Sequence, residues 1–441
     1  MGNTGIYVGL DIGTTSIKVI VAEYVKGQMN VIGVGSERSE GLSRGVVVDI
    51  DKAVAAIQNA VRQAEQRAEI EIHEVTAGIP ANLLEIEPCQ GMIAVADESK
   101  EINDSDVRNV AAAALVRNLP PEREILTIIP DEFIVDGFDG IKDPRGMIGV
   151  RLEMHGILLT APKTVIHNMQ KCIERAGLVL NELVVNPLSL GKLALADGEQ
   201  DFGTVLIDLG GGQSTAAVIH DHKLKYTYVD QEGGDYITKD ISVVLNTSFD
   251  SAEKVKRDYG YADSLQASSE EDFPVEVVGK DAPITVNEKY LAEIIEARLT
   301  QIFEKMNQAL RKVGALDLPG GIVMTGGVTA LPGIVELASD IFDHNVKLYI
   351  PDEMGLRHPS FAQALSLISY TANLSEIDLI VQSTLKGTNT TKGNYTSRKV
   401  VKTDSEQFRP ANNQTTTQNE ASEPKKERFA SIKKFISNFF E

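Results

Sequence analysis

The sequence predicts an α/β protein made of two duplicated halves, and three observations support this fold class. Two β-rich runs within residues 6–22 flank a tight glycine turn, which is the pattern of a hairpin. A second hairpin of the same type occupies residues 205–219, and laying Asp208 on Asp11 aligns the two units without a gap. Runs with the 3.6-residue period of helices alternate with further strands along the rest of the body.

Length and composition agree with a multidomain globular protein. The 441 residues exceed what one hydrophobic core normally organises, so we expect two or more domains and a tail. With 42% hydrophobic residues and no apolar run of about 18 residues, the body is expected to be soluble. The net charge of −20 disfavours nonspecific binding of nucleic acid or anionic lipid by the body, so we expect no nucleic-acid partner.

The N-terminal residues and the cysteine content indicate the cellular compartment of the protein. The N-terminus lacks the basic and apolar regions of a secretory signal, so export is not expected. The motif for N-myristoylation of Gly2 needs Ser or Thr at the sixth position, where this sequence has Ile6, so this modification is not expected. Cys89 and Cys172 are too few for a disulfide framework or a zinc cluster, and we interpret both as core thiols in a reducing compartment.

The elements after the first hairpin follow in chain order. Asp51 is expected to cap a helix whose apolar residues keep the helical period. Residues 226–306 are more helical and acidic, and residues 321–331 return to strand and turn chemistry. Residues 360–370 are apolar and are predicted to be helical.

Both hairpin tips are candidate phosphate-binding elements. A Gly-Thr-Thr tip at residues 13–15 presents backbone N–H groups and hydroxyls to phosphate oxygens, and Lys18 on the next strand adds charge. Asp11 and Asp208, each near the end of its first strand, are placed to hold Mg²⁺ through water. One such turn alone is more simply an ordinary tight hairpin. Two copies, one in each half, favour a ligand site between the halves.

Two further segments are candidates for the same site. The strand that ends at Gly326 and Gly327 permits close backbone approach to a ligand. Glu253 and Lys256 lie three residues apart on one face of a predicted helix, which alone would be a solvated charge pair. The sequence has no G-x-x-x-x-G-K-[ST] motif and no G-x-G-x-x-G after a strand, so neither a P-loop nor a Rossmann fold is supported.

The chain changes character after Leu385. Residues 386–424 are rich in Thr, Asn, Ser, Gln and Lys, and we predict a disordered linker because such a segment cannot offset its ordering entropy. Residues 425–441 are basic in an acidic protein and are predicted to form an amphipathic helix. Its apolar face comprises Phe429, Ile432, Phe435, Ile436, Phe439 and Phe440.

Three roles fit such a helix. It can dock on the protein's own body, insert into the groove of a partner, or lie in a membrane interface. The linker, the crowded phenylalanines and the neighbouring Lys433 and Lys434 oppose docking on the body, and they fit both a membrane interface and the groove of a partner.

Together, the two phosphate hairpins, the glycine-rich segment and a helix at 360–365 resemble the actin/Hsp70/sugar-kinase superfamily. More specifically, residues 140–147 with 151–153, and residues 207–212, are similar to stretches of the bacterial cell-division family FtsA in the same order. The similarity runs from about residue 6 to residue 370, and the tail is also FtsA-like. The resemblance implies an actin-like two-half ATPase fold with duplicated β-sheet domains that close on ATP.

The resemblance also implies a division into subdomains, one of which, 1C, would be the FtsA replacement for an actin subdomain. The expected ranges are 1–83 for 1A, 84–162 for 1C, 163–226 for the first part of 2A, 227–305 for 2B, 306–385 for the rest of 2A and the return to 1A, 386–424 for the linker and 425–441 for the membrane-targeting helix.

Roles for individual residues follow from the resemblance as well. The β- and γ-phosphates would contact Gly13, Thr14, Thr15, Lys18, Gly210, Gly211 and Gly212. Gly234 and Asp235 would lie near the ribose, Glu253 and Lys256 near the ribose and adenine, and Gly326 and Gly327 against the adenosine. Asn186 departs from the pattern, because actin-like ATPases commonly have Gln or Glu there to orient the attacking water. Asn is shorter and is not a base, so we expect slow hydrolysis at best and a mainly structural ATP.

The function implied is a cell-division protein that binds ATP and Mg²⁺, polymerises on the cytoplasmic face of the cell membrane at the division site, and anchors the ring of the tubulin-like protein FtsZ. Its implied partners are the FtsZ C-terminal tail, further copies of itself, anionic lipid and other division proteins. Arg298 matches a family position that meets the FtsZ tail, although an exposed Arg on a solvated face is the simpler alternative.

A second class of function is an enzyme of the same superfamily, such as a sugar kinase or a chaperone ATPase. A chaperone would need a C-terminal β-sandwich, and only linker and helix are predicted after residue 385. A phosphotransfer substrate remains open.

Overall fold

The structure is a computed structural model that describes residues 4–95, 101–280 and 282–389. Most of the predicted linker and the whole predicted membrane-targeting helix lie outside the described residues, including its apolar face and its lysines.

The first half is built on a five-stranded sheet in the order β11-β6-β1-β2-β3. Strands β1, β2 and β3 form an antiparallel meander, whereas β6 and β11 continue the sheet in parallel. The bounds are Gly5–Ile12 for β1, Ser16–Val25 for β2, Gln28–Arg38 for β3, Glu74–Ile79 for β6 and Val179–Val185 for β11. The predicted first hairpin is confirmed.

Helix α1 (Ile50–Ala68) packs directly on β2 and β3. A Cβ added to Gly35 would lie only 1.8 Å from the Ala60 carbonyl oxygen, so the helix approaches the sheet at a position that requires glycine. Asp49 caps this helix by accepting a hydrogen bond from the Lys52 N–H, and Asp51 lies in the first turn. The prediction that Asp51 is the cap was therefore wrong, because the chain turns into the helix two residues earlier.

The second half repeats the same sheet plan. Its five strands run in the order β14-β13-β12-β17-β18, with an antiparallel meander followed by two parallel strands. The bounds are Thr204–Leu209 for β12, Ser214–His220 for β13, Lys223–Asp230 for β14, Ile322–Thr325 for β17 and Val346–Leu348 for β18. The predicted duplication is confirmed, because both sheets share one topology.

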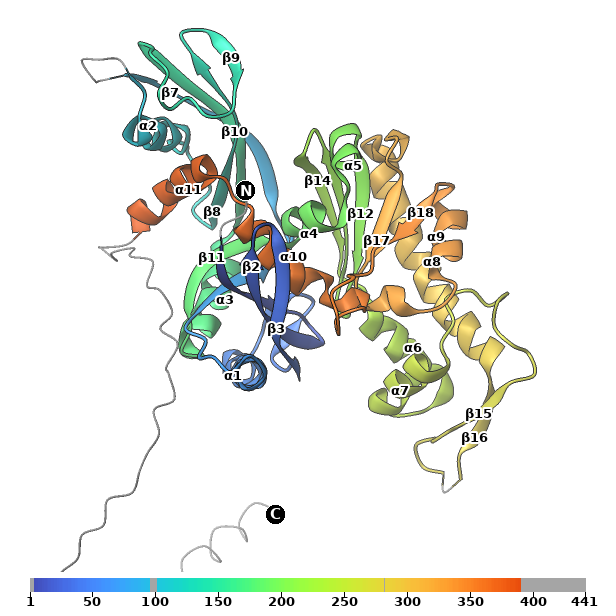
Figure 1. Ribbon diagram of the computed structural model, residues 1–441. Coiled ribbons are helices and arrows are strands. Elements are labelled where there is room, and N and C mark those ends of the chain that lie inside the picture. The colour runs from blue at the N-terminus through green and yellow to red at the C-terminus, as the bar shows by residue number, and fades with distance from the viewer. Residues whose placement is uncertain (1–3, 96–100, 281, 390–441) are drawn as a thin grey trace, which may run out of the picture. The chain divides into compact units, whose positions relative to one another are not determined.

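Helices α4 (Asn186–Ala194) and α10 (Ala362–Ala372) pack against each other and lie between the two sheets (Figure 1). The Ser366 hydroxyl donates to the Ser189 hydroxyl at 2.9 Å within this buried contact. The connecting elements of the first half are β4 (Leu42–Ser43), β5 (Val46–Val47) and α3 (Lys163–Arg175), and those near the second sheet are α5 (Asp197–Phe202), η1 (Ala315–Asp317), η2 (Gly327–Ala330), α9 (Ile334–Phe342) and η3 (Pro359–Phe361).

A separate four-stranded sheet in the order β7-β10-β8-β9 forms with helix α2 its own apolar core. The bounds are Glu85–Ala94 for β7, Asp104–Ala114 for α2, Arg123–Val135 for β8, Phe138–Ile141 for β9 and Arg151–Pro162 for β10. Helix α11 (Glu376–Asn389) adds Ile377 and Val381 to this core. It extends four residues into the segment predicted as linker.

The remaining part of the second half is mainly helical, as the sequence predicts. It contains α6 (Gly234–Leu245), α7 (Phe249–Tyr259), β15 (Asp272–Val275), β16 (Ile284–Asn287) and α8 (Glu288–Lys312). Among the described residues, no single helix is long and apolar enough to cross a membrane. One sharply bent pair of helices, Pro359–Ala372 with Glu376–Leu385, meets the requirement by length and composition alone.

Candidate functional site

The tips of the two sheet hairpins meet. A Cβ added to Gly211 would lie 2.2 Å from Thr15 Cγ2, and one added to Gly212 would lie 2.5 Å from Thr14 Cγ2. Any side chain at these glycines would displace the threonines of the other half. The glycines therefore allow the first tip (residues 13–15) and the second tip (residues 210–213) to approach each other, as a site between the halves requires.

Two carboxylates lie behind these tips. Asp11 is in β1, and its Oδ2 lies 4.0 Å from the buried Lys18 Nζ. Burial raises the pKa of Asp11, with Lys18 opposing the shift. Burial also raises the pKa of Asp208 to about 7, and the charge of Asp11 adds to this effect. Two mutually repelling carboxylates form the kind of environment that a bound cation stabilises.

The donor set fits a magnesium ion held mainly through water. No group of three or more His, Cys, Asp or Glu side chains able to hold a metal occurs among the described residues. Mg²⁺ keeps several waters and needs only one or two carboxylates, which agrees with Asp11 and Asp208 as the acidic groups of the site.

Helix α6 begins on the second tip. The backbone N–H of Gly234 donates to the Gly210 carbonyl at 3.0 Å, and the N–H of Asp235 donates to the Gly211 carbonyl at 2.8 Å. Burial raises the pKa of Asp235, while the charge of Lys256 opposes that shift. The predicted ribose residues thus lie directly beside the predicted phosphate residues.

Glu253 and Lys256 form a buried polar cluster with α6 rather than a solvated pair. The Lys256 ammonium lies 2.6 Å from Glu253 Oε2 and donates to the Thr238 hydroxyl at 2.7 Å and to the Gly234 carbonyl at 3.1 Å. Burial acts to raise the pKa of Glu253, but the charge of Lys256 and hydrogen bonds from Lys256, Thr238 and Arg257 together outweigh it, so the pKa is lowered. Both side chains are therefore fixed by hydrogen bonds next to the start of α6.

Gly326 and Gly327 complete the surroundings of the second hairpin. Gly326 has φ +100°, and a Cβ there would lie 2.4 Å from Asp208 Oδ1. A Cβ added to Gly327 would lie 3.6 Å from the Cβ of Ser360, so this segment also lies next to the turn before α10. All the predicted nucleotide residues are consequently gathered around the two tips.

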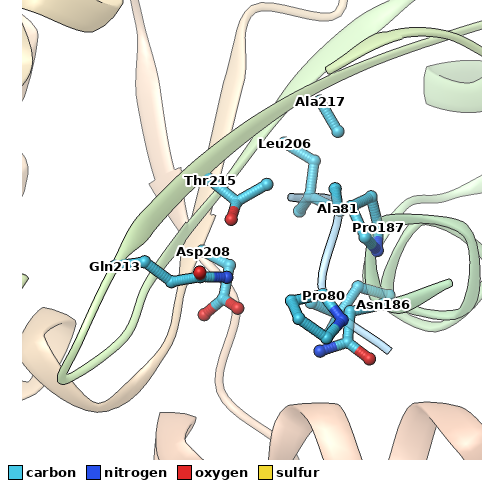
Figure 2. Close-up of a pocket in the computed structure, with 10 residues that line it drawn as sticks. Pro80, Ala81, Asn186, Pro187, Leu206, Asp208, Gln213, Thr215 and Ala217 are labelled. Atoms are coloured by element: carbon cyan, nitrogen blue, oxygen red, sulfur yellow. The ribbon is translucent and has the colours of Figure 1, made fainter. Parts of the chain in front are cut away.

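Asn186 lies at the start of α4 beside a small cavity of about 10 Å³. The cavity is lined by Pro80, Ala81, Asn186, Pro187, Leu190, Leu206, Asp208, Gln213, Thr215 and Ala217. Figure 2 shows Asp208 and Thr215 between Gln213 on one side and Asn186 on the other. The cavity has room for about one water molecule.

Sequence reasoning missed three side chains of this region. Gln213 and Thr215 follow the predicted glycines of the second tip, and their positions in the hairpin were the available signal. His358 precedes η3, and its pKa is lowered by burial and by the charges of Lys18 and Arg257. A single histidine before a Pro-Ser turn carries no pattern that would have identified it.

Arg298 lies on α8 and is not one of the predicted nucleotide residues. Its guanidinium donates to Asp240 Oδ2 at 2.6 Å and to Glu232 Oε2 at 3.0 Å, and its side chain is 18% exposed. It is therefore not the exposed arginine on a solvated face that was the simpler alternative.

Sequence comparisons connect this architecture to one family. The model described as "Cell division protein FtsA" matches residues 205–366, and the model described as "SHS2 domain inserted in FTSA" matches residues 82–160. The chain is 61% identical over 387 residues to the cell division protein FtsA of Enterococcus hirae, covering 88% of each chain. It is 43% identical over 377 residues to FtsA of Bacillus subtilis, covering 86% of each.

Solved structures with low sequence identity share the fold. The PilM–PilN type IV pilus biogenesis complex aligns with a TM-score of 0.59 at 16% identity, covering 84% of this chain and 100% of that one. MreB5 of Spiroplasma citri bound to ADP aligns with a TM-score of 0.52 at 12% identity, covering 83% and 95%. The MamK double helical filament aligns at 0.50 and 14% identity, covering 84% and 99%. The two-half architecture is therefore actin-like.

Proposed function

The chain belongs to the FtsA family of cell-division proteins, and on this basis we propose that it binds ATP with Mg²⁺ between its halves and anchors the FtsZ ring to the cytoplasmic face of the membrane at the division site. One observation carries the nucleotide part of the proposal: the two hairpin tips meet in front of Asp11 and Asp208.

Each of the predicted nucleotide residues around the two tips then has a role in binding. The backbone N–H groups of the two tips, with Lys18, hold the β- and γ-phosphates. Asp11 and Asp208 would hold a magnesium ion through water, and the ion would neutralise phosphate charge. Gly234 and Asp235 lie by the ribose, Glu253 and Lys256 fix the wall near ribose and adenine, and the glycine pair after β17 lies against the adenosine. Because these groups come from both halves, bound ATP joins the halves together.

The subdomain division of the sequence analysis belongs to the same proposal. The sheet β7-β10-β8-β9 with α2 would be subdomain 1C, and α6, α7, β15, β16 and α8 would make up 2B. The membrane-targeting helix at 425–441 supplies the anchor, and the linker supplies its reach.

Filament formation fits the fold of the neighbours, one of which is a double helical filament. A filament would present many copies of the terminal helix at once, so that weak single contacts with lipid add up to firm binding. The FtsZ tail would dock on 2B beside α8. A groove of about 380 Å³ in this part offers a mixed surface for a peptide, with apolar residues such as Val244, Ile284 and Tyr290 beside polar ones such as Asn246 and Lys280.

The test is co-sedimentation with anionic liposomes, with and without ATP·Mg²⁺ and fluorescent FtsZ. The full chain is compared with a chain ending at Asn389, where α11 ends. We expect the full chain to bring FtsZ to the liposomes and the shortened chain to bind FtsZ in solution without bringing it down. The adaptor function would be excluded if both chains carried FtsZ to the membrane equally, or if neither bound FtsZ.

A further inference from the structure

The small cavity between the halves is lined by groups that can hold one water molecule in a fixed orientation. Asp208 and Thr215 supply acceptors from the second hairpin, and amides on Gln213 and Asn186 flank them (Figure 2). Pro80 and Ala81 close the cavity from the first half. A volume of about 10 Å³ admits about one water and excludes a larger group.

The two amides of this cavity differ in where their acceptor oxygens lie. The Asn186 Oδ1 faces the backbone of Gly78, since a Cβ added to Gly78 would lie within 2.3 Å of it. The Gln213 Oε1 faces Gly45, where an added Cβ would lie 2.5 Å away. Both oxygens are buried and accept no hydrogen bond from any part of the chain that the structure describes. Each is thus an acceptor in need of a donor.

Gln213 also lies next to the first tip. The Gly45 N–H donates to the Thr14 hydroxyl at 2.9 Å, so the residue facing the Gln213 oxygen is bonded to a predicted phosphate residue. Gln213 itself belongs to the second tip. Its amide therefore lies where the two phosphate-binding tips meet, whereas the Asn186 oxygen is directed at Gly78 of strand β6.

We infer that Gln213 orients the water that attacks the γ-phosphate, in place of the Asn186 position expected from the family pattern. This inference rests on the proposed ATP site. The water oxygen forms a bond to the γ-phosphorus, and the bond from that phosphorus to the β–γ bridging oxygen breaks, its electron pair leaving with ADP. One water proton stays on the hydrogen phosphate product and the other passes to solvent. Gln213 accepts a hydrogen bond from the water, so that a lone pair points at phosphorus.

The experiment measures single-turnover phosphate release and, separately, ATP affinity by equilibrium binding of labelled ATP. Gln213→Ala should slow phosphate release by about tenfold or more, because a misplaced water costs rate steeply, while ATP affinity changes less than about threefold. Asn186→Ala should slow release less than Gln213→Ala does. Gln66→Ala, the same substitution at an exposed position of α1, controls for a general effect.

Gln213→Glu separates positioning from structure. It keeps acceptor oxygens but adds a charge near Asp208, so we expect it to retain more of the maximal rate than Gln213→Ala while binding ATP more weakly. A Gln213→Ala protein that binds ATP and releases phosphate at the parent rate would overturn the inference and leave the ATP site standing. A parent protein that binds ATP without releasing phosphate would overturn it too. A parent protein that binds no ATP would overturn the proposed function itself.

Discussion

Arg44 of the first half donates a hydrogen bond to the hydroxyl of Tyr236 in the second half, at 2.6 Å. The Tyr236 ring also lies 5.7 Å from the Arg44 guanidinium and 5.6 Å from that of Arg298. Tyr236 belongs to α6, the helix that begins on the second tip with the predicted ribose residues. Its side chain thus touches both the contact between the halves and Arg298, the residue proposed to meet FtsZ. The ring of Tyr236 therefore contacts one arginine from each half.

Replacing Tyr236 by Phe should loosen the halves without disturbing their cores. The change removes one hydrogen bond between the halves, worth about 1 kcal/mol, and keeps the ring between the two arginines. We expect faster limited proteolysis in the absence of ATP and weaker ATP binding by a few-fold. Tyr259→Phe, at a ring that stacks on Phe273, is the matched control. Equal protease sensitivity of both variants would exclude a role for the Tyr236 hydroxyl in closure.

Asp208→Asn should have opposite effects on the protein with and without ligand. Burial and Asp11 raise the pKa of Asp208 to about 7, so its charge is unfavourable in the ligand-free fold, and removing the charge should raise the melting temperature. The same change removes half of the proposed magnesium site. The parent should gain about 2.7 kcal/mol at an ATP·Mg²⁺ concentration of 100 Kd, and this gain should shrink in the variant or when EDTA is added. Melting curves with an unchanged ligand gain would contradict the role of Asp208.

Gly326→Ala should disrupt the site in two ways, by straining the backbone and by placing a Cβ too close to Asp208. The residue has φ +100°, and its new Cβ would lie 2.4 Å from Asp208 Oδ1, so we expect a loss of about 1–3 kcal/mol in stability together with loss of ATP binding. Gly355 also has a positive φ, of +81°, but no atom lies within 4 Å of an added Cβ. Gly355→Ala should therefore cost only the backbone term and leave ATP binding intact. Chemical denaturation and ATP binding of the two variants provide the comparison.

The duplicated sheets were predictable because each hairpin has a local signature, a glycine turn between β-rich runs, and a repeat is visible as an alignment of Asp11 with Asp208. Most residues of the candidate site could also be predicted from the sequence, since they lie in those turns. Gln213 could not be predicted in this way, because its proposed role depends on the approach of Gly45 from the other half, and no local sequence pattern encodes that contact. Likewise, Arg298 was identified by position alone, and its ion pairs with Asp240 and Glu232 join residues about 60 positions apart in the chain.

The environment of Arg298 determines how its role in FtsZ binding should be tested. Arg298→Glu would leave Asp240 without its ion-pair partner, leave Glu232 paired only with Lys305, and add repulsion. We therefore expect a loss of stability as well as of tail affinity. Tyr290, two turns earlier on α8, lines the groove and takes part in neither ion pair. If the tail docks beside α8, Tyr290→Ala should weaken binding of a fluorescent FtsZ tail peptide while stability is preserved. Unchanged peptide affinity in both variants would remove this face as the docking site.

Membrane binding by the predicted helix at 425–441 should depend on its apolar face and not on charge alone. Burying one phenylalanine contributes about 1.5–3 kcal/mol, and each basic residue near an anionic surface adds about 1 kcal/mol. Phe439→Glu removes the first contribution, and we expect it to release the protein from anionic liposomes. Asn438→Glu adds the same charge to the polar face and is the matched control, so it should bind with only a modest loss.

The net charge of −20 means that the body is repelled by the surface to which the helix binds. A single helix must overcome this repulsion as well as its own ordering cost, so a monomer should bind weakly and reversibly. A filament holds many helices at a high effective concentration, and its binding should be tight. Liposome binding should therefore rise steeply with protein concentration where the protein self-associates. If monomeric Phe439→Glu protein still co-sediments with anionic liposomes at physiological salt, the helix is not the anchor.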